Sequence, residues 1–237
     1  MGGTSQVDDL PFDLIIFDCD GVLIDSEIIS ARMLVSELAL LGVDIDMAYV
    51  TDHFLGRSYP TVMKMIRKDF NVTLKPEFED QYRSRLLAAF ASELKVMGHV
   101  VPILGALKTP WCVATSSSPS RAARSLEITG LRALVGPRLF TASEVAEGKP
   151  APDLFLHAAA RMQIAPDRCL VIEDSLNGIR AARAAGMAVW RFVGGSHLAG
   201  GLADEPSDAR PDLRFASFAD FFQIGGLGGT TPPGSRI

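Results

Sequence analysis

The sequence contains few cysteines, and their placement limits the class of protein that it can encode. Its 237 residues include three cysteines, Cys19, Cys112 and Cys169, which lie far apart, each in or beside an apolar run. Disulfide scaffolds are small and dense in cysteine, whereas isolated cysteines in apolar runs are typical of small buried side chains. We therefore expect no disulfide framework, and we expect a reducing, cytoplasmic location.

Long apolar runs and an excess of basic residues are also missing. No apolar run reaches the ~18 residues that a membrane span needs, and the N-terminus lacks the apolar segment of a secretory signal. The chain has 23 Lys and Arg against 28 Asp and Glu, a formal net charge of -5. This balance argues against nucleic-acid binding on a basic face, although local cations or a metal ion can still hold a small anionic substrate. We expect neither a membrane nor a nucleic acid as partner.

Short β-like runs alternate with helical segments through most of the chain. The expected strands are 11–17, 111–114, 139–140, 169–172 and 189–192. The helices between them are expected near 118–129, 152–162 and 178–185. Such alternation predicts βαβ units and a parallel sheet, and hence an α/β fold.

Residues 26–98 break this alternation, because their pattern is helical throughout. Helices are expected at 26–42, 49–54, 59–70 and 76–97. We therefore predict an α/β core made of residues 12–25 and 99–223, with residues 26–98 inserted as an all-helical domain after the first strand. Residues 224–237 are rich in Gly and Pro and are expected to form a disordered, low-complexity tail.

Asp18 and Asp20 stand two residues apart at the end of the apolar run 14–17 and are followed by Gly21. Open α/β sheets bind ligands beyond the carboxyl ends of their strands. Neighbouring carboxylates raise one another's pKa unless a cation neutralises them. The pair therefore indicates a charged nucleophile, a proton carrier and a metal ion, although alone it is equally consistent with a solvated strand end.

Three further polar segments follow β-like runs: 115–118 (Thr-Ser-Ser-Ser), 148–153 (containing Lys149) and 173–178 (Glu-Asp-Ser-Leu-Asn-Gly). Each has an ordinary explanation when taken singly, because hydroxyls commonly cap helices, a lysine before proline is commonly a solvated charge, and Glu-Asp-Ser commonly forms a turn. All of them nevertheless fall at the carboxyl ends of strands in one α/β domain, so we expect them to form one site.

In order and spacing the four segments resemble the haloacid dehalogenase superfamily of phosphoryl-transfer enzymes, in the branch similar to beta-phosphoglucomutase and 6-phosphogluconate phosphatase. The resemblance covers about residues 12–197. It is most specific in the Asp-x-Asp-Gly-Val-Leu-x-Asp-Ser sequence at 18–26 and the Glu-Asp-Ser-x-x-Gly sequence at 173–178. It implies a Rossmann-like three-layer core and a small four-helix cap, hinged after residue 25 and near residue 98, that closes over the site.

The same resemblance implies roles for the phosphoryl-binding residues. Asp18 would accept the phosphoryl group as an aspartyl phosphate, while Asp20 would protonate the leaving oxygen and then activate the hydrolytic water. Thr115 would hold the phosphoryl oxygens, together with Ser116 and Ser117. These roles fit phosphoryl transfer, which depends mostly on positioning and on neutralising charge.

The resemblance also implies a Mg²⁺ cofactor. Asp18, the carbonyl of Asp20, Asp174 and, directly or through water, Glu173 would surround the ion, and hard oxygen ligands of this kind suit Mg²⁺. Lys149 would offset the charge between the nucleophile and the phosphoryl group.

In the cap, Gly56 and Arg57 are the candidate substrate-binding residues, since an arginine after a glycine loop can bind a carboxylate or a second phosphate. Arg57 is equally consistent with a solvated charge on the cap surface, and Tyr59 and Lys64 are less favoured candidates. The mutases of this branch carry a histidine where this chain has Ser30, and the arginine that binds their second phosphate corresponds to Tyr59. Both differences favour a phosphatase acting on a small phosphorylated metabolite, such as a sugar phosphate or 6-phosphogluconate.

A mutase of the beta-phosphoglucomutase type is the alternative. A non-enzymatic receiver-like module, phosphorylated on an aspartate for signalling, is a distant one, because such a module has no use for an inserted cap or a second aspartate. A cap that must swing favours a monomer.

Overall fold

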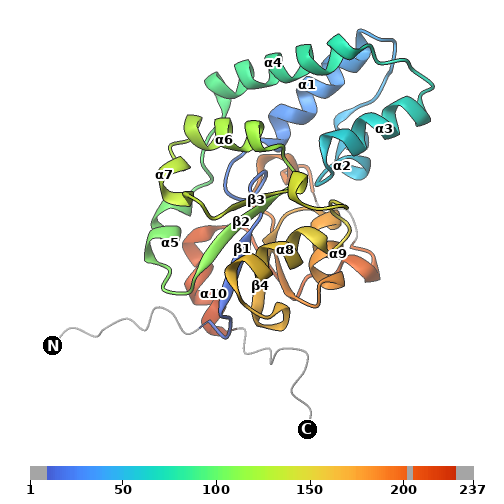
Figure 1. Ribbon diagram of the computed structural model, residues 1–237. Helices are drawn as coiled ribbons and strands as arrows, with labels where there is room; N and C mark the ends of the chain where they lie inside the picture. The colour runs from blue at the N-terminus through green and yellow to red at the C-terminus, as the bar shows by residue number, and fades with distance from the viewer. Residues whose placement is uncertain (1–9, 202–204, 228–237) are drawn as a thin grey trace, which may run out of the picture.

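The computed structural model describes residues 10–201 and 205–227 (Figure 1). Within these residues one sheet of six strands has the order β3-β2-β1-β4-β5-β6. Its strands are β1 (Leu14–Phe17), β2 (Trp111–Thr115), β3 (Leu139–Thr141), β4 (Cys169–Glu173), β5 (Ala188–Phe192) and β6 (Leu213–Phe215). Every neighbouring pair is parallel. In this order the chain winds outward from β1 in both directions, which leaves a crevice at the carboxyl ends of the central strands.

Both faces of the sheet are buried. Ile15 and Phe17 of β1 belong to one apolar cluster, whereas Leu14 and Ile16 belong to another, because successive side chains of a strand point to opposite faces. Helices α5 (Val100–Ala106), α6 (Pro119–Ile128), α7 (Arg132–Val135) and α10 (Phe221–Leu227) contribute to the first cluster. Helices α8 (Asp153–Met162) and α9 (Leu176–Ala184) contribute to the second. The predicted three-layer α/β core is confirmed.

Between β1 and β2 the described chain forms four helices, which we call the helical insertion (residues 26–98). They are α1 (Glu27–Ala39), α2 (Met47–His53), α3 (Tyr59–Asp69) and α4 (Pro76–Glu93). In Figure 1 they lie above the carboxyl ends of the strands. Asp46 accepts a hydrogen bond from the Tyr49 amide at 2.8 Å and so caps the first turn of α2. The predicted helical segment after the first strand is therefore present.

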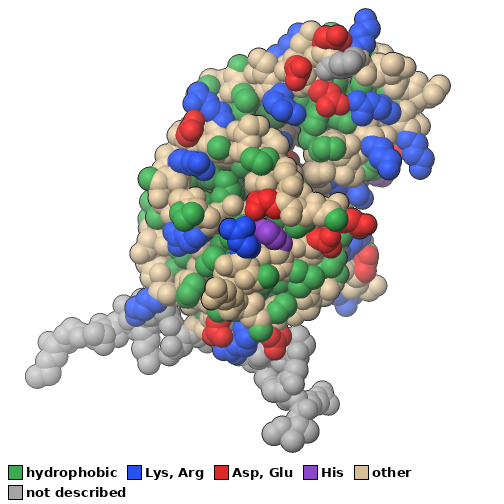
Figure 2. All heavy atoms as spheres, viewed as in Figure 1, with side chains coloured by type: hydrophobic (Ala, Val, Ile, Leu, Met, Phe, Trp, Pro, Cys, Tyr) green, Lys and Arg blue, Asp and Glu red, His purple; other side chains and the backbone are tan. Residues whose placement is uncertain are grey.

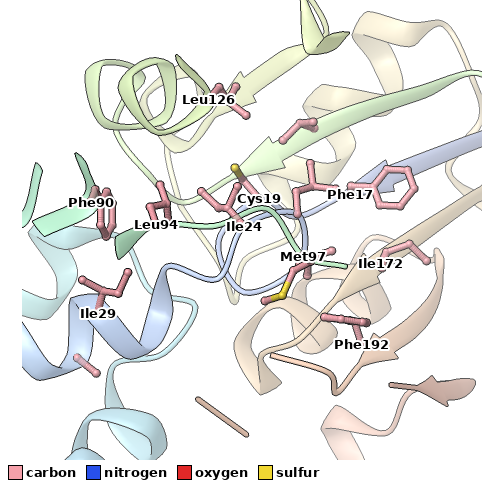
Figure 3. Packing of buried hydrophobic residues seen from close by; sticks show 14 of the residues in the cluster. Phe17, Cys19, Ile24, Ile29, Phe90, Leu94, Met97, Leu126, Ile172 and Phe192 are labelled. Atoms are coloured by element: carbon pink, nitrogen blue, oxygen red, sulfur yellow. The ribbon is translucent and has the colours of Figure 1, made fainter. Parts of the chain in front are cut away.

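The two connections between the insertion and the core run side by side. The Asp25 amide donates to the Lys95 carbonyl and the Met97 amide to the Leu23 carbonyl, both at 2.9 Å. Apolar packing continues across these connections from Phe90 and Ile29 of the insertion to Phe17 of the core (Figure 3). The insertion and one face of the sheet therefore share a continuous apolar core.

Several boundaries differ from the sequence-based expectation. Helix α4 ends at Glu93 rather than near residue 97, because Leu94 is extended and Val96 pairs with Ile24. Helix α5 and strand β6 were not predicted. Helix α10 runs to Leu227, so the expected disordered tail cannot begin at 224, and residues 228–237 lie outside the described residues. Short 3₁₀ helices occupy Ala142–Glu144, Pro166–Arg168, Ser196–Leu198, Ser207–Ala209 and Phe218–Asp220.

All three cysteines are buried and free, as expected. No helix in the described ranges is long and apolar enough to cross a membrane. On the face of the molecule shown in Figure 2, Lys and Arg side chains are interspersed with Asp and Glu.

Candidate active site

The four predicted segments meet at the carboxyl ends of β1, β2 and β4, which are neighbours in the sheet. The Asp18 amide donates to the Ile172 carbonyl at 2.9 Å and so continues the β1–β4 ladder by one residue. A cavity of about 480 Å³ lies between these strand ends and the helical insertion. Asp18, Asp20, Thr115, Ser116, Ser117, Gly56 and Arg57 all line it. The fold thus brings seven of the predicted site residues to one cavity.

Lys149 is the centre of the buried charges. Its ammonium donates to Asp18 Oδ1 at 2.5 Å, to Glu173 Oε1 at 2.7 Å and to the Ala114 carbonyl at 3.2 Å. Its side chain is 1 % exposed. Burial alone would lower the pKa of Lys149, but Asp18 and Glu173 outweigh that effect and hold the pKa above its usual value. Lys149 is therefore a fixed positive charge behind the nucleophile position.

Asp20 accepts four side-chain hydrogen bonds. Oδ1 accepts from Ser26 at 2.6 Å and from Arg121 at 3.0 Å, while Oδ2 accepts from Ser117 at 2.6 Å and from Thr115 at 3.2 Å. Burial alone would raise the pKa of Asp20, but Arg121 and then the Ser117 hydrogen bond outweigh it and hold the pKa below its usual value. In this arrangement Asp20 is held as a carboxylate.

Glu173 organises the fourth segment. Its Oε2 accepts from the amides of Asp174 and Ser175, both at 2.9 Å, and from Ser175 Oγ at 3.0 Å. A Cβ at Gly178 would lie 1.8 Å from Glu173 Oε1, so only glycine fits on the first turn of α9 at this point. Both carboxylate oxygens of Glu173 are therefore already engaged, one by Lys149 and one by the segment itself.

Three carboxylates could together hold a metal ion. One oxygen from each of Asp18, Glu173 and Asp174 lies within 4.8 Å of the other two. Asp174 Oδ2 is buried without a hydrogen-bond partner, although His197 Nε2 lies 2.8 Å away without the alignment of a hydrogen bond. Burial raises the pKa of Asp18 and Asp174 well above the usual value, and neighbouring carboxylates raise both further. A divalent cation would remove this repulsion, and an all-oxygen donor set fits Mg²⁺.

The loop between α2 and α3 rests directly on the core. Ser116 Oγ donates to the Gly56 carbonyl at 3.0 Å, and Asn177 Nδ2 donates to the Leu55 carbonyl at 2.8 Å. Gly56 has φ +74°, and a Cβ there would lie 2.1 Å from Ser175 Oγ. Gly56 is therefore required both by its backbone conformation and by its close approach to the core.

The other candidates in the insertion are placed differently. Arg57 lines the cavity, and its Nε donates to the His53 carbonyl at 2.9 Å. Tyr59 stacks on Tyr82 with ring centroids 5.4 Å apart, and its hydroxyl is buried without a partner. Lys64 is exposed and does not line the cavity.

Sequence reasoning missed several residues that hold the site together. Arg121 lies on a helix of the core, where nothing in the local sequence distinguishes it from other polar helix residues. Asn177 lies within the predicted segment 173–178, but no role was assigned to it there. Arg191 is buried in β5, where its Nε donates to the Asp174 carbonyl at 2.9 Å and its Nη1 pairs with Glu205 at 2.8 Å. The one sequence signal that could have identified Arg191 was the presence of a charged residue within an apolar strand.

Residues 12–186 match the haloacid dehalogenase-like hydrolases. The chain belongs to this family. It is 30% identical over 184 residues to a 6-phosphogluconate phosphatase of Escherichia coli (strain K12), with 77% of this chain and 83% of that protein covered. The predicted resemblance is confirmed, and with it the prediction that the chain is an enzyme.

Two solved structures of the family share the fold. A haloacid dehalogenase-like protein of unknown function from Agrobacterium tumefaciens has a TM-score of 0.78 and 34% identity, covering 92% of this chain and 100% of its own. A family hydrolase from Deinococcus radiodurans, solved with bound phosphate and sodium, has a TM-score of 0.72 and 31% identity, covering 93% and 98%. Both similarities extend over the core and the helical insertion.

Replacing Gly56 by Ala tests whether the loop rests on the core in solution. Gly42→Ala is a matched control, because Gly42 has φ +76° but nothing within 4 Å of its added Cβ. We expect Gly42→Ala to cost about 1–2 kcal/mol of unfolding free energy for the left-handed backbone. Gly56→Ala should cost about 1–3 kcal/mol more for the steric overlap. Urea unfolding measures both, and equal losses would contradict the contact with Ser175.

Proposed function

We propose that the protein is a Mg²⁺-dependent phosphatase that hydrolyses a small phosphorylated metabolite through an aspartyl phosphate. One observation carries the proposal: Asp18 lines the cavity with Lys149 bound to its Oδ1, and Asp20 lines the same cavity two residues further on. This gives a carboxylate nucleophile, a fixed cation and a second carboxylate in one place. Splitting hydrolysis at a covalent intermediate makes each step easier.

The residues divide the reaction into two displacements. An Asp18 oxygen forms a bond to phosphorus while the bond to the leaving oxygen breaks. Asp20, a carboxylate in this structure, takes up a proton before this step and transfers it to the leaving oxygen. Water then gives a proton to Asp20 and attacks phosphorus, which releases inorganic phosphate and restores the Asp18 carboxylate. Lys149 offsets the charge throughout, and the amide of Ser116 is a candidate donor to the phosphoryl oxygens. The hydroxyls of Thr115, Ser116 and Ser117 can also donate to them, provided that each gives up its hydrogen bond to Asp20 or to the Gly56 carbonyl.

Asp18, the Asp20 carbonyl and Asp174 would hold Mg²⁺. When bound, the ion neutralises charge between the nucleophile and the phosphoryl oxygens. Glu173 would contact the ion through water, because Lys149 and the 174–175 segment already occupy its oxygens. Asp174 Oδ2 accepts no hydrogen bond, although His197 Nε2 lies 2.8 Å from it, and this supports Asp174 as a direct ligand.

The cavity supports a small, anionic substrate as the proposed class. Its volume of about 480 Å³ is within the range of small-molecule sites. Arg57 and Arg83 line its wall in the insertion, where they can attract a second anionic group. Together with the 6-phosphogluconate phosphatase relative, this favours a sugar phosphate or a sugar-acid phosphate such as 6-phosphogluconate. We propose a monomer in which the insertion covers the bound substrate.

A mutase remains the alternative, and the surroundings of Ser30 favour a phosphatase. The Ser30 hydroxyl donates to the Ser26 carbonyl at 2.9 Å and accepts from Arg121 at 3.1 Å. The Ser30 hydroxyl is therefore engaged in two hydrogen bonds, one to the chain that begins its own helix and one to the core. It does not take the role of the histidine that the mutases carry at this position.

Phosphate release from a panel of sugar and sugar-acid phosphates tests the function. We expect release from one or a few substrates with Mg²⁺, and its loss with EDTA or in Asp18→Asn. The panel includes beta-glucose 1-phosphate with a bisphosphate primer. Conversion of that substrate to the 6-phosphate without phosphate release would instead identify a mutase, and no reaction on any substrate would contradict both functions.

Metal binding can be measured without turnover. The raised pKa of Asp18 and Asp174 means that the metal-free protein loses stability as pH rises through those folded-state values. Without metal, Asp174→Asn should therefore be more stable than the wild type at pH values above the ordinary carboxyl pKa, and the difference should grow as pH rises. Mg²⁺ at about 100 Kd should add about 2.7 kcal/mol to the wild type and far less to Asp174→Asn. Thermal melting measures this, and an equal Mg²⁺ effect on both proteins would exclude Asp174 as a ligand.

Arg57→Ala tests the proposed anion contact. Loss of a charged hydrogen bond should raise KM for 6-phosphogluconate by about tenfold or more, with a smaller change for p-nitrophenyl phosphate. Lys64→Ala, an exposed residue of the same helical insertion, is the control and should change neither KM. A similar change of both KM values in Arg57→Ala would make its role structural.

A further inference from the structure

Arg121 is a partly buried cation that the proposed chemistry leaves without a role. It lies on the first turns of α6, after the Thr115–Ser118 segment, and its side chain is 19 % exposed. Ser118 caps this helix and accepts from the Arg121 amide at 3.4 Å. The helix start therefore fixes the direction in which the arginine leaves the backbone.

The guanidinium joins the core to the helical insertion. Its Nη2 carries two protons, and it donates to Asp20 Oδ1 at 3.0 Å and to Ser30 Oγ on α1 at 3.1 Å. The ring of Phe90, on α4, lies 5.4 Å from the guanidinium carbon. Three separate elements, the β1 loop, α1 and α4, therefore meet at one side chain.

We propose that Arg121 is a positioning residue for Asp20, which it holds in place by joining that carboxylate to the helical insertion. This rests on the proposed function, in which Asp20 carries the proton to and from the reacting oxygen. A proton carrier must be held within hydrogen-bond distance of that oxygen, and a small misplacement is costly. Ser117 and Thr115 fix the carboxylate from the core, and Ser26 fixes it from the first residue of the insertion. Among these partners of Asp20, Arg121 is a core residue that also contacts helices α1 and α4 of the insertion.

Two other roles for Arg121 give different results. An arginine that bound a second anionic group of the substrate would affect KM for anionic substrates alone. An arginine that only packed α6 against α4 would affect all substrates equally. The geometry favours positioning, because the Nη2 protons are directed at Asp20 and Ser30, and because planar guanidinium packing on Phe90 fixes the orientation.

The test compares p-nitrophenyl phosphate with phenyl phosphate. The two substrates are similar in shape, but the nitrophenolate leaves without a proton, whereas the more basic phenolate depends on an acid. In Arg121→Met, which keeps the apolar stem beside Phe90, kcat for phenyl phosphate should fall about 10- to 100-fold more than kcat for p-nitrophenyl phosphate. Arg121→Lys should show a smaller difference, and adding Arg121→Met to Asp20→Asn should not widen the difference already present in Asp20→Asn.

Arg124→Met is the matched control, since Arg124 lies on the same helix, is 54 % exposed and pairs with Glu127. It should keep the wild-type ratio between the two substrates. Ser30→Ala removes the partner in the insertion and leaves Arg121 intact, so it should shift the ratio in the same direction by less. This variant decides the question if Arg121→Met does not fold, as judged by circular dichroism.

Equal losses on the two phenyl phosphates would overturn the positioning role, and so would a change confined to KM for 6-phosphogluconate. Failure of the proposed function is distinguishable, because the wild type would then release no phosphate from either phenyl phosphate, with or without Mg²⁺. That result would overturn both proposals, whereas an unchanged ratio in an active wild-type background would overturn the role of Arg121 alone.

Discussion

The contact of Lys149 with Asp18 and Glu173 is the interaction on which the rest of the site depends. The carboxylates of Asp18, Glu173 and Asp174 lie together with side chains almost entirely shielded from water. Among the residues that the structure describes, Lys149 is the one cation that bonds to two of them. Burying charge is costly unless it is paired. One ammonium can balance only one of three carboxylates, and the raised pKa of Asp18 and Asp174 reflects this shortage of positive charge. The cation that we propose for this position would complete the balance.

Sheet order explains why residues so distant in sequence can meet. Asp18, Thr115 and Glu173 follow or end β1, β2 and β4, and the order β3-β2-β1-β4-β5-β6 makes these three strands adjacent. Parallel strands direct their carboxyl ends to one edge, so each loop brings its polar groups to the same place. The helical insertion interrupts the chain between β1 and β2, and it therefore leaves and re-enters the core beside the site.

The core and its site residues were predictable because each depends on local signals. Apolar runs that end in carboxylates or hydroxyls mark strand ends, and the parallel order of the strands brings these ends together. The contribution of Arg121 was not predictable, nor was the role of Asn177 within the predicted segment 173–178, because both depend on which element of the insertion packs against their helix. The end of α4 was misplaced for a similar reason: the pairing of Val96 with Ile24, 72 residues earlier in the chain, ends the helix, whereas the local pattern continues.

The core holds the loop between α2 and α3 by its backbone, which leaves side chains of that loop available for other roles. Ser116 and Asn177 of the core bind the backbone carbonyls of Gly56 and Leu55, not their side chains. Docking therefore depends on the shape of the loop, and Gly56 is the residue whose identity that shape requires. Arg57 and Tyr59, next in sequence and lining the cavity, are not used to hold the loop on the core. Side chains at these positions can change without altering how the insertion rests on the core, so the proposed selection of substrate and the docking of the loop would be carried by separate groups on one short segment.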